Sequence, residues 1–161
     1  MRTFVAIPLP APCHSMLEKI QGSLRLFGAD VRWTSVSSIH LTTKFLGEID
    51  PALLPRLTSA LNEHARLPVF DLRMRGLGGF PDLQKPRLIW CGIEGQTDQL
   101  AKLQTGVETA CHQLGFARED RPFHPHLTLG RVQGKRNLQP LLDYIRIGSG
   151  VECSLGVDHF N

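Results

Sequence analysis

The tripeptide His40-Leu41-Thr42 occurs a second time in the chain, as His126-Leu127-Thr128, and this repeat decides how we interpret the fold. Each copy lies in a segment with the alternating pattern of a strand, follows a polar stretch and is soon followed by a glycine. About half of the 161 residues separate the two copies. A duplicated lobe would produce this spacing, so we expect two similar halves within one chain.

Each copy of the tripeptide would place its histidine and its threonine on one face of a strand, because side chains alternate between the two faces. The leucine between them would point to the other face. Thr43 would join the leucine in the first copy, and Leu129 would join it in the second. Two such strands facing one cleft would bring two imidazoles and two hydroxyls around one point.

This group of side chains suits the hydrolysis of a cyclic phosphodiester. The reaction needs a base that deprotonates water and an acid that protonates the leaving ribose oxygen, and a histidine, with an ordinary pKa of about 6.5, can do either. Threonine hydroxyls can donate hydrogen bonds to the phosphoryl oxygens as charge develops. We therefore interpret His40 and His126 as the catalytic pair, with Thr42 and Thr128 as phosphate ligands. No metal or other cofactor is required, and on the residues alone the acid and base roles could be exchanged.

Other residues near the two copies are candidates for the same site. Arg131, just after the second copy, could contact a phosphate, and Phe45 could either stack on a base or belong to the core. His124 and His126 could instead chelate a metal, but the sequence offers no nearby carboxylate or third histidine to complete the set. A metal-dependent hydrolase is therefore the weaker alternative.

The composition is that of an ordinary globular domain, with 42% apolar and 20% charged residues. The net charge of +3 is compatible with a polyanionic ligand without requiring one. There is no long run of like charge and no apolar stretch of the length that spans a membrane. We expect neither a nonspecific nucleic-acid tail nor a membrane partner.

The start of the chain and the cysteines predict the compartment. Pro8, Pro10 and Pro12 interrupt the first short apolar run, which makes a poor signal peptide. The cysteines are scattered and form no C-x-x-C pair, so we expect reduced, mostly buried thiols and a cytoplasmic protein. The four cysteines are Cys13, Cys91, Cys111 and Cys153.

The hydrophobic pattern predicts strands and helices that are interleaved without a regular β-α-β rhythm. Strands are expected over 3–9, 31–34, 39–46, 69–77, 88–93, 126–132 and 151–158, and helices over 15–27, 51–67, 97–114 and 138–144. Gly78 and Gly79 are expected to begin a loop, and Thr97 is expected to cap the third helix. The fold class that follows is α+β with antiparallel sheets.

Several blocks of sequence agree, in order, with one known family. They are Arg2-Thr3-Phe4-Val5-Ala6-Ile7, Arg32-Trp33, His40-Leu41-Thr42-Thr43-Lys44-Phe45-Leu46-Gly47, Gly79-Phe80-Pro81, Pro86-Arg87-Leu88-Ile89-Trp90 and His126-Leu127-Thr128-Leu129-Gly130-Arg131. Over nearly its whole length the chain resembles the LigT-like branch of the two-histidine phosphoesterases. The resemblance is specific because it rests on several blocks rather than on one tripeptide.

The resemblance implies a single bilobal domain over residues 1–161. The two lobes would be pseudo-symmetric, each an antiparallel sheet with outer helices, and the active-site cleft would lie between them. Members of this branch usually continue beyond the region 151–158 with a further strand and a short tail. This sequence ends at Asn161, so we expect that tail to be missing.

The resemblance also implies an activity. Bacterial and archaeal members are RNA 2′,3′-cyclic phosphodiesterases that leave a 2′-phosphate, and some also ligate tRNA halves reversibly through a 2′–5′ bond. By analogy His40 would be the acid for the leaving 3′ oxygen and His126 the base for water. The remaining site residues implied are Thr42, Thr128 and Arg131 on the phosphate and Phe45 on the terminal base. We expect a monomer that acts on RNA ends.

Two alternatives to RNA-end hydrolysis stay open. A cyclic phosphodiesterase for small nucleotides, such as ADP-ribose cyclic phosphate, would keep both histidines and change only the substrate. A noncatalytic RNA-end binding domain would bind without turnover, although binding alone needs no acid–base pair. Comparing the turnover of a small cyclic nucleotide with that of a cyclic-phosphate RNA end would separate these functions.

Overall fold

A computed structural model of the chain describes residues 1–66, 69–147 and 152–157. Its strands are β1 (Arg2–Ile7), β2 (Val31–Trp33), β3 (Leu41–Glu48), β4 (Phe70–Phe80), β5 (Leu88–Gly95), β6 (His126–Val132) and β7 (Glu152–Val157). Its α-helices are α1 (Ala11–Arg25), α2 (Leu54–His64), α3 (Thr97–Gln113) and α4 (Leu138–Ile147), with short 3₁₀ turns η1 (Val36–Ser38) and η2 (Pro51–Leu53). The recorded strand pairs are antiparallel, which confirms the predicted α+β class.

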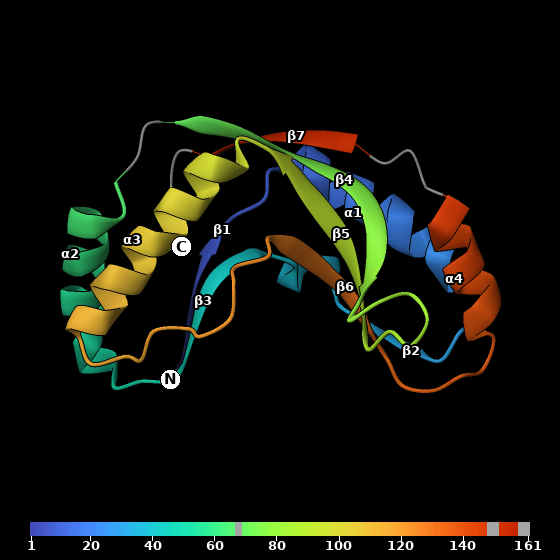
Figure 1. The fold of residues 1–161 in the computed structure, drawn as a ribbon, viewed down its shortest axis with the longest axis horizontal. Coiled ribbons are helices and arrows are strands. Elements are labelled where there is room, and N and C mark those ends of the chain that lie inside the picture. Colours follow the sequence, from blue (N-terminus) through green and yellow to red (C-terminus); the bar gives the residue numbers. More distant parts are fainter. Residues whose placement is uncertain (67–68, 148–151, 158–161) are drawn as a thin grey trace.

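The strands form two separate sheets of unequal size. β1 pairs with β3, and the other five strands are ordered β2-β6-β5-β4-β7. The second copy lies at the start of β6, in the larger sheet. The first copy begins one residue before β3 of the smaller sheet, because Leu41 and Thr42 open that strand and His40, predicted inside it, directly precedes it. These two strands contact each other at the centre of the molecule (Figure 1). The expected arrangement of two lobes, each contributing one copy, is confirmed.

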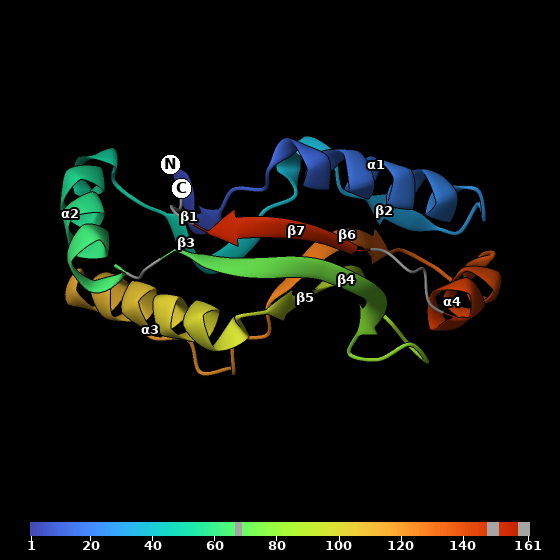
Figure 2. The ribbon, with the colours of Figure 1, turned by 90° about the horizontal axis from the view of Figure 1, so that it is seen from above.

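The helices flank the sheets at opposite ends of the molecule. α2 and α3 pack on each other at the end nearer β1 and β3, and α1 and α4 lie at the other end, beside the larger sheet (Figures 1 and 2). One hydrophobic core joins these layers. Leu41, Leu127 and Leu129 are fully buried in it, so the leucines of both copies point to the core as predicted.

Three of the cysteines, Cys13, Cys91 and Cys111, are buried as expected, and the side chain of Cys153 lies outside the described part of the structure. The helices within the described ranges include none that combines the length and the apolar character needed to cross a membrane.

The predicted loop at Gly78 and Gly79 is wrong, because β4 continues through both glycines to Phe80. Gly78 lies opposite Trp90 of β5, and a Cβ atom on Gly78 would clash with the indole ring. The glycine therefore makes room for a large ring that lies on the face of the strand, and it does not mark a turn.

The predicted cap of the third helix is also wrong. The N-cap position of α3 is occupied by Gln96, whose side chain caps no backbone group, and Thr97 is already helical. Helix α1 starts at Ala11, earlier than predicted, because a proline in the first turn needs no hydrogen-bond donor. Residues 67, 151 and 158, at the ends of predicted elements, lie outside the described ranges.

Two helical glycines provide a matched test of helix packing. A Cβ atom on Gly106 in α3 would clash with the carbonyl oxygen of His64 at the end of α2, whereas a Cβ atom on Gly22 in α1 would meet nothing within 4 Å. Because alanine favours a helix over glycine by about 1 kcal/mol, Gly22→Ala should raise the free energy of unfolding by up to that amount. Gly106→Ala should lower it by about 1–3 kcal/mol, since α2 and α3 must separate. Urea denaturation measures both, and equal stabilisation would contradict the close approach of the helices.

Candidate active site

A β-bulge follows the first copy of the tripeptide. In the pairing of β3 with β1, Thr42 lies opposite Ala6 and Lys44 lies opposite Val5, so Thr43 is an extra residue. The hydroxyl of Thr43, which is buried, donates a hydrogen bond of 2.9 Å to the Val5 carbonyl. The bulge shifts the alternation of β3 by one residue as far as a second irregularity between Phe45 and Gly47.

This shift places Phe45 on the same face as Thr42. Residues three apart in a regular strand point to opposite faces. Here Phe45 lies opposite Phe4 of β1, with the ring centroids 6.0 Å apart, and the Phe4 ring lies 5.6 Å from the imidazole of His40. The exposed fraction of Phe45 is 69%, so it belongs to the open face with His40 and not to the core. Sequence reasoning assigned no role to Phe4.

The second copy carries a bulge at the equivalent position. In the pairing of β6 with β5, Gly130 lies opposite Ile89 and Thr128 lies opposite Trp90, which leaves Leu129 as the extra residue. The equivalence of Thr43 and Leu129 shows that the repeat extends beyond the tripeptide to the backbone distortion that follows it.

A buried glutamine holds the bulge in β6. The side-chain amide of Gln21, in α1, donates to the carbonyl oxygens of Leu129 at 3.0 Å and of Thr34 at 2.7 Å. The backbone N–H of Thr34 also donates to the Leu129 carbonyl, at 2.8 Å. A bulge disturbs the regular ladder, and the Leu129 carbonyl at the bulge accepts hydrogen bonds from both of these donors. Gln21 therefore stabilises the geometry that the second copy needs.

The bulge in β6 turns Arg131 to the face of the second histidine. The partners of Arg131, Thr128 and His126 on β5 follow one another at intervals of two residues, from Leu88 to Gly92. They therefore lie on one face of β5. Cross-strand partners share a face, so His126, Thr128 and Arg131 all point the same way. Arg131 is exposed there, as a phosphate ligand must be.

A second arginine lies beside Arg131. Arg32 of β2 is its direct cross-strand partner, and both side chains are exposed. Like charges directly opposite each other are unfavourable in a sheet unless something compensates them. The pair therefore indicates a place for an anion, and the sequence interpretation had given Arg32 no role.

The ring of His126 is oriented by the residue two positions before it. Nδ1 of His126 lies 2.7 Å from the carbonyl oxygen of His124. A carbonyl oxygen only accepts hydrogen bonds, so Nδ1 must carry the hydrogen, and in the neutral imidazole Nε2 is then unprotonated. His124 contributes its backbone to this contact, and the ring of His126 is set up to accept a proton through Nε2.

The bulge in β3 also sends Lys44 into the protein interior. Lys44 Nζ lies 3.0 and 3.2 Å from the two carboxylate oxygens of Glu108 in α3 and 3.0 Å from the carbonyl oxygen of Ala117. Glu108 accepts a further hydrogen bond, of 3.2 Å, from the backbone N–H of Glu119. The ion pair thus ties β3 to the segment that leads from α3 toward His126.

Among the described residues, the Cys111 thiol and the Asp82 carboxyl have shifted pKa values. Burial raises the pKa of the Cys111 thiol, and the nearby charge of Lys44 acts in the opposite direction. The backbone N–H groups of Lys85 and Gln84 lower the pKa of the exposed Asp82 carboxyl by donating to it. Neither group belongs to β3 or β6.

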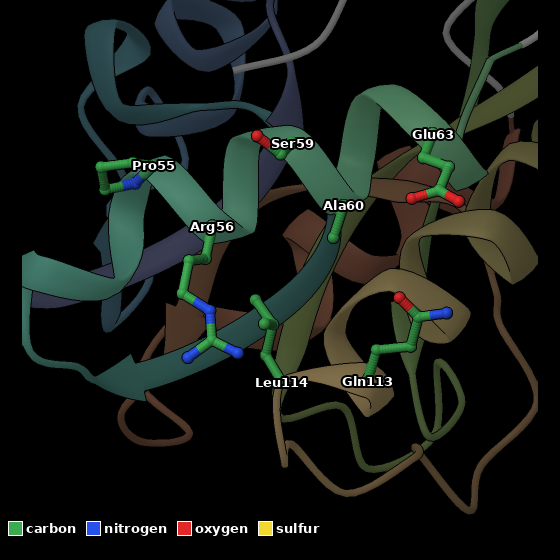
Figure 3. Close-up of a pocket in the computed structure, with 7 residues that line it drawn as sticks. All are labelled: Pro55, Arg56, Ser59, Ala60, Glu63, Gln113 and Leu114. Atoms are coloured by element: carbon green, nitrogen blue, oxygen red, sulfur yellow. The ribbon is translucent and has the colours of Figure 1, made fainter.

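Within the described ranges, neither a cluster of metal ligands nor the groove beside α2 adds a residue to the site. Among the described residues, no group of three or more His, Cys, Asp or Glu side chains is placed to hold a metal ion. A shallow groove runs between α2 and the end of α3 and contains no residue of β3 or β6 (Figure 3). It is lined by Pro55, Arg56, Ser59, Ala60, Glu63, Gln113 and Leu114.

The chain is similar in sequence to several known proteins. A model of the 2′-5′ RNA ligase superfamily matches residues 17–159. A protein of Archaeoglobus fulgidus named RNA 2′,3′-cyclic phosphodiesterase is 34% identical over 148 residues, which cover 91% of this chain and 80% of that protein. A protein of Aeropyrum pernix with the same name is 32% identical over 136 residues, 84% of this chain and 77% of that protein.

Solved structures agree over almost the entire chain. The crystal structure of TT0787 of Thermus thermophilus has a TM-score of 0.77 and 27% identity, covering 99% of this chain and 86% of that one. The crystal structure of Escherichia coli LigT complexed with 3′-AMP has a TM-score of 0.75 and 25% identity, covering 99% of this chain and 84% of that one.

The buried ion pair predicts an asymmetry between single and double variants. The side chains of Lys44 and Glu108 are only 7% and 10% exposed. Lys44→Met should lower the free energy of unfolding by about 3–5 kcal/mol, because it leaves a buried carboxylate without its partner. The double variant Lys44→Met/Glu108→Leu should recover much of that loss. Urea denaturation checks this, and losses that simply add would contradict a coupled pair.

Proposed function

Because this chain belongs to the 2′-5′ RNA ligase superfamily, we propose that it hydrolyses RNA 2′,3′-cyclic phosphate ends to 2′-phosphomonoesters and also makes or breaks 2′–5′ RNA linkages. Two of its relatives carry the name RNA 2′,3′-cyclic phosphodiesterase. The observation that carries the proposal is a pair of bulged strands in contact. β6 carries His126 and Thr128 on one face. β3 carries Thr42 and directly follows His40, whose ring lies 5.6 Å from that of Phe4.

His126 is the base in this proposal. Its Nε2 is unprotonated when Nδ1 donates to the His124 carbonyl, so Nε2 takes a proton from the attacking water. The water oxygen forms a bond to phosphorus as the bond from phosphorus to O3′ breaks. His40 gives its proton to O3′, and the phosphate stays on O2′. The tautomer of His126 thus supports the roles that family resemblance suggests.

The other side chains on the two faces bind the substrate. Thr42 and Thr128 donate hydrogen bonds to the phosphoryl oxygens, and Arg131 compensates the charge that develops on them. Phe45, exposed beside Phe4 and His40, stacks on the terminal base. The proposal therefore assigns the phosphate to both sheets and the terminal base to the smaller one.

The biological setting belongs to the same proposal. The substrate is an RNA end, with tRNA halves as a candidate, and the protein acts as a monomer in the cytoplasm. The net charge of +3 and the exposed pair of Arg32 and Arg131 support a polyanionic substrate.

Hydrolysis of a short RNA with a 2′,3′-cyclic phosphate tests the proposal directly. His40→Ala and His126→Ala should each lower kcat about 10²–10⁴-fold, because each removes one proton-transfer group. His112→Ala, at an exposed position of α3, should leave the rate unchanged. The assay is run in excess EDTA, and the product should carry its phosphate on O2′.

Three outcomes would count against this function. A folded wild-type protein without turnover would exclude RNA-end hydrolysis. Full activity after loss of either histidine would exclude the acid–base pair. Activity that EDTA abolishes would favour the metal-dependent alternative that involves His124 and His126.

A further inference from the structure

We propose that Trp90 forms a second base-stacking subsite, for the nucleotide whose O5′ is bonded to phosphorus in a 2′–5′ linkage. This inference rests on the proposed function and deepens it, because it gives the larger sheet a nucleotide of its own. It begins from the position of Trp90 on the face that carries Thr128.

The indole of Trp90 lies against the sheet. Gly78, its partner on β4, has no Cβ atom, and one placed there would clash with Cζ2 and lie 2.5 Å from Cη2 of the ring. A Cβ atom on Gly92 would lie 3.4 Å from Cζ3. Gly92 is the cross-strand partner of His126. The six-membered ring therefore covers Gly78 and extends toward the row that contains His126.

Trp90 is a large apolar side chain that the core does not use. Within the described part of the chain, it is neither a core residue nor one of the partly buried residues that pack on the core, and it keeps part of its surface exposed. An aromatic ring that is supported by backbone on one side and accessible to solvent is the form of a base-stacking platform.

The other tryptophan of the chain shows the contrast. Trp33 lies opposite Gly130, which in turn lies opposite the buried Ile89. A Cβ atom on Gly130 would come within 2.9 Å of the Trp33 ring. Trp33 thus also lies on a glycine, but on the opposite face of the sheet, where it packs against the core. Packing on the core explains the position of Trp33. Within the described residues, Trp90 makes no comparable contact with the core.

The chemistry decides which base Trp90 receives. In cleavage of a 2′–5′ linkage, the 3′-hydroxyl attacks phosphorus and gives its proton to His40. The bond from phosphorus to O5′ breaks, and His126, which is doubly protonated in this direction, gives its Nε2 proton to O5′, which leaves a cyclic phosphate and a 5′-hydroxyl. The nucleoside that bears O5′ therefore lies on the His126 side, beside Trp90, and the first base lies on the His40 side, beside Phe45.

Three substrates separate this subsite from its alternatives. They are a nucleoside 2′,3′-cyclic phosphate, an oligoribonucleotide with a 2′,3′-cyclic end and a 2′–5′-linked dinucleotide. Trp90→Leu should lower kcat/KM for the dinucleotide roughly tenfold, mainly through KM, and leave the other two within about twofold. Trp90→Phe, which keeps an aromatic face, should retain most of the activity on the dinucleotide.

Other patterns of loss would overturn the assignment. No loss on the dinucleotide would show that no base stacks on Trp90. Equal loss on all three substrates would indicate a structural role, and loss on the oligoribonucleotide would place the upstream strand there instead. Circular dichroism of each variant separates these results from misfolding.

A binding experiment keeps the test independent of turnover. A 2′–5′ dinucleotide without the 3′-hydroxyl on its first ribose cannot be cleaved. It should quench the fluorescence of the Trp33→Phe protein, which retains only Trp90, and leave the Trp90→Phe protein unchanged. Quenching without any hydrolysis by wild type would overturn the proposed function while supporting the subsite, and no quenching of an active protein would overturn the subsite alone.

Discussion

The site depends on two β-bulges, each one residue past the threonine of a His-x-Thr motif. A regular strand would turn residues three apart to opposite faces, so Phe45 and Arg131 would be lost from the faces of the histidines. Each bulge has its own support, the Thr43 hydroxyl in β3 and the buried Gln21 amide in β6. The repeat therefore encodes a backbone distortion as well as two pairs of side chains.

The same distortion links the site to stability. After the bulge in β3 the next side chain, Lys44, points inward, and a lysine there requires the carboxylate of Glu108. Glu108 in turn holds the backbone of Glu119, in the segment that leads to the second motif. The chain thus binds its two halves together through residues on the reverse side of the strand that carries the first motif.

Local patterns predicted the elements and the faces of the two tripeptides, because alternation depends only on neighbouring residues. The bounds predicted for β6, 126–132, are those observed. Local patterns could not predict the bulges, because an extra residue is defined only by the register with the partner strand. The sequence predicts a loop at Gly78 because the ring that this glycine accommodates belongs to another strand. The positions of Trp90 and Arg32 on the sheet likewise depend on the register of partner strands. The exposure of Phe45 excludes the core position, and its contact with a base stays a prediction.

If both motifs belong to one site, His40 and His126 face the same bound ligand. Imidazole signals of ¹³C-labelled histidines, assigned with single His→Gln variants, can be followed while a nucleoside 2′-monophosphate is added. The signals of His40 and His126 should move together along one saturation curve with a single Kd. Movement of only one of them, or two curves with different Kd values, would contradict a shared site.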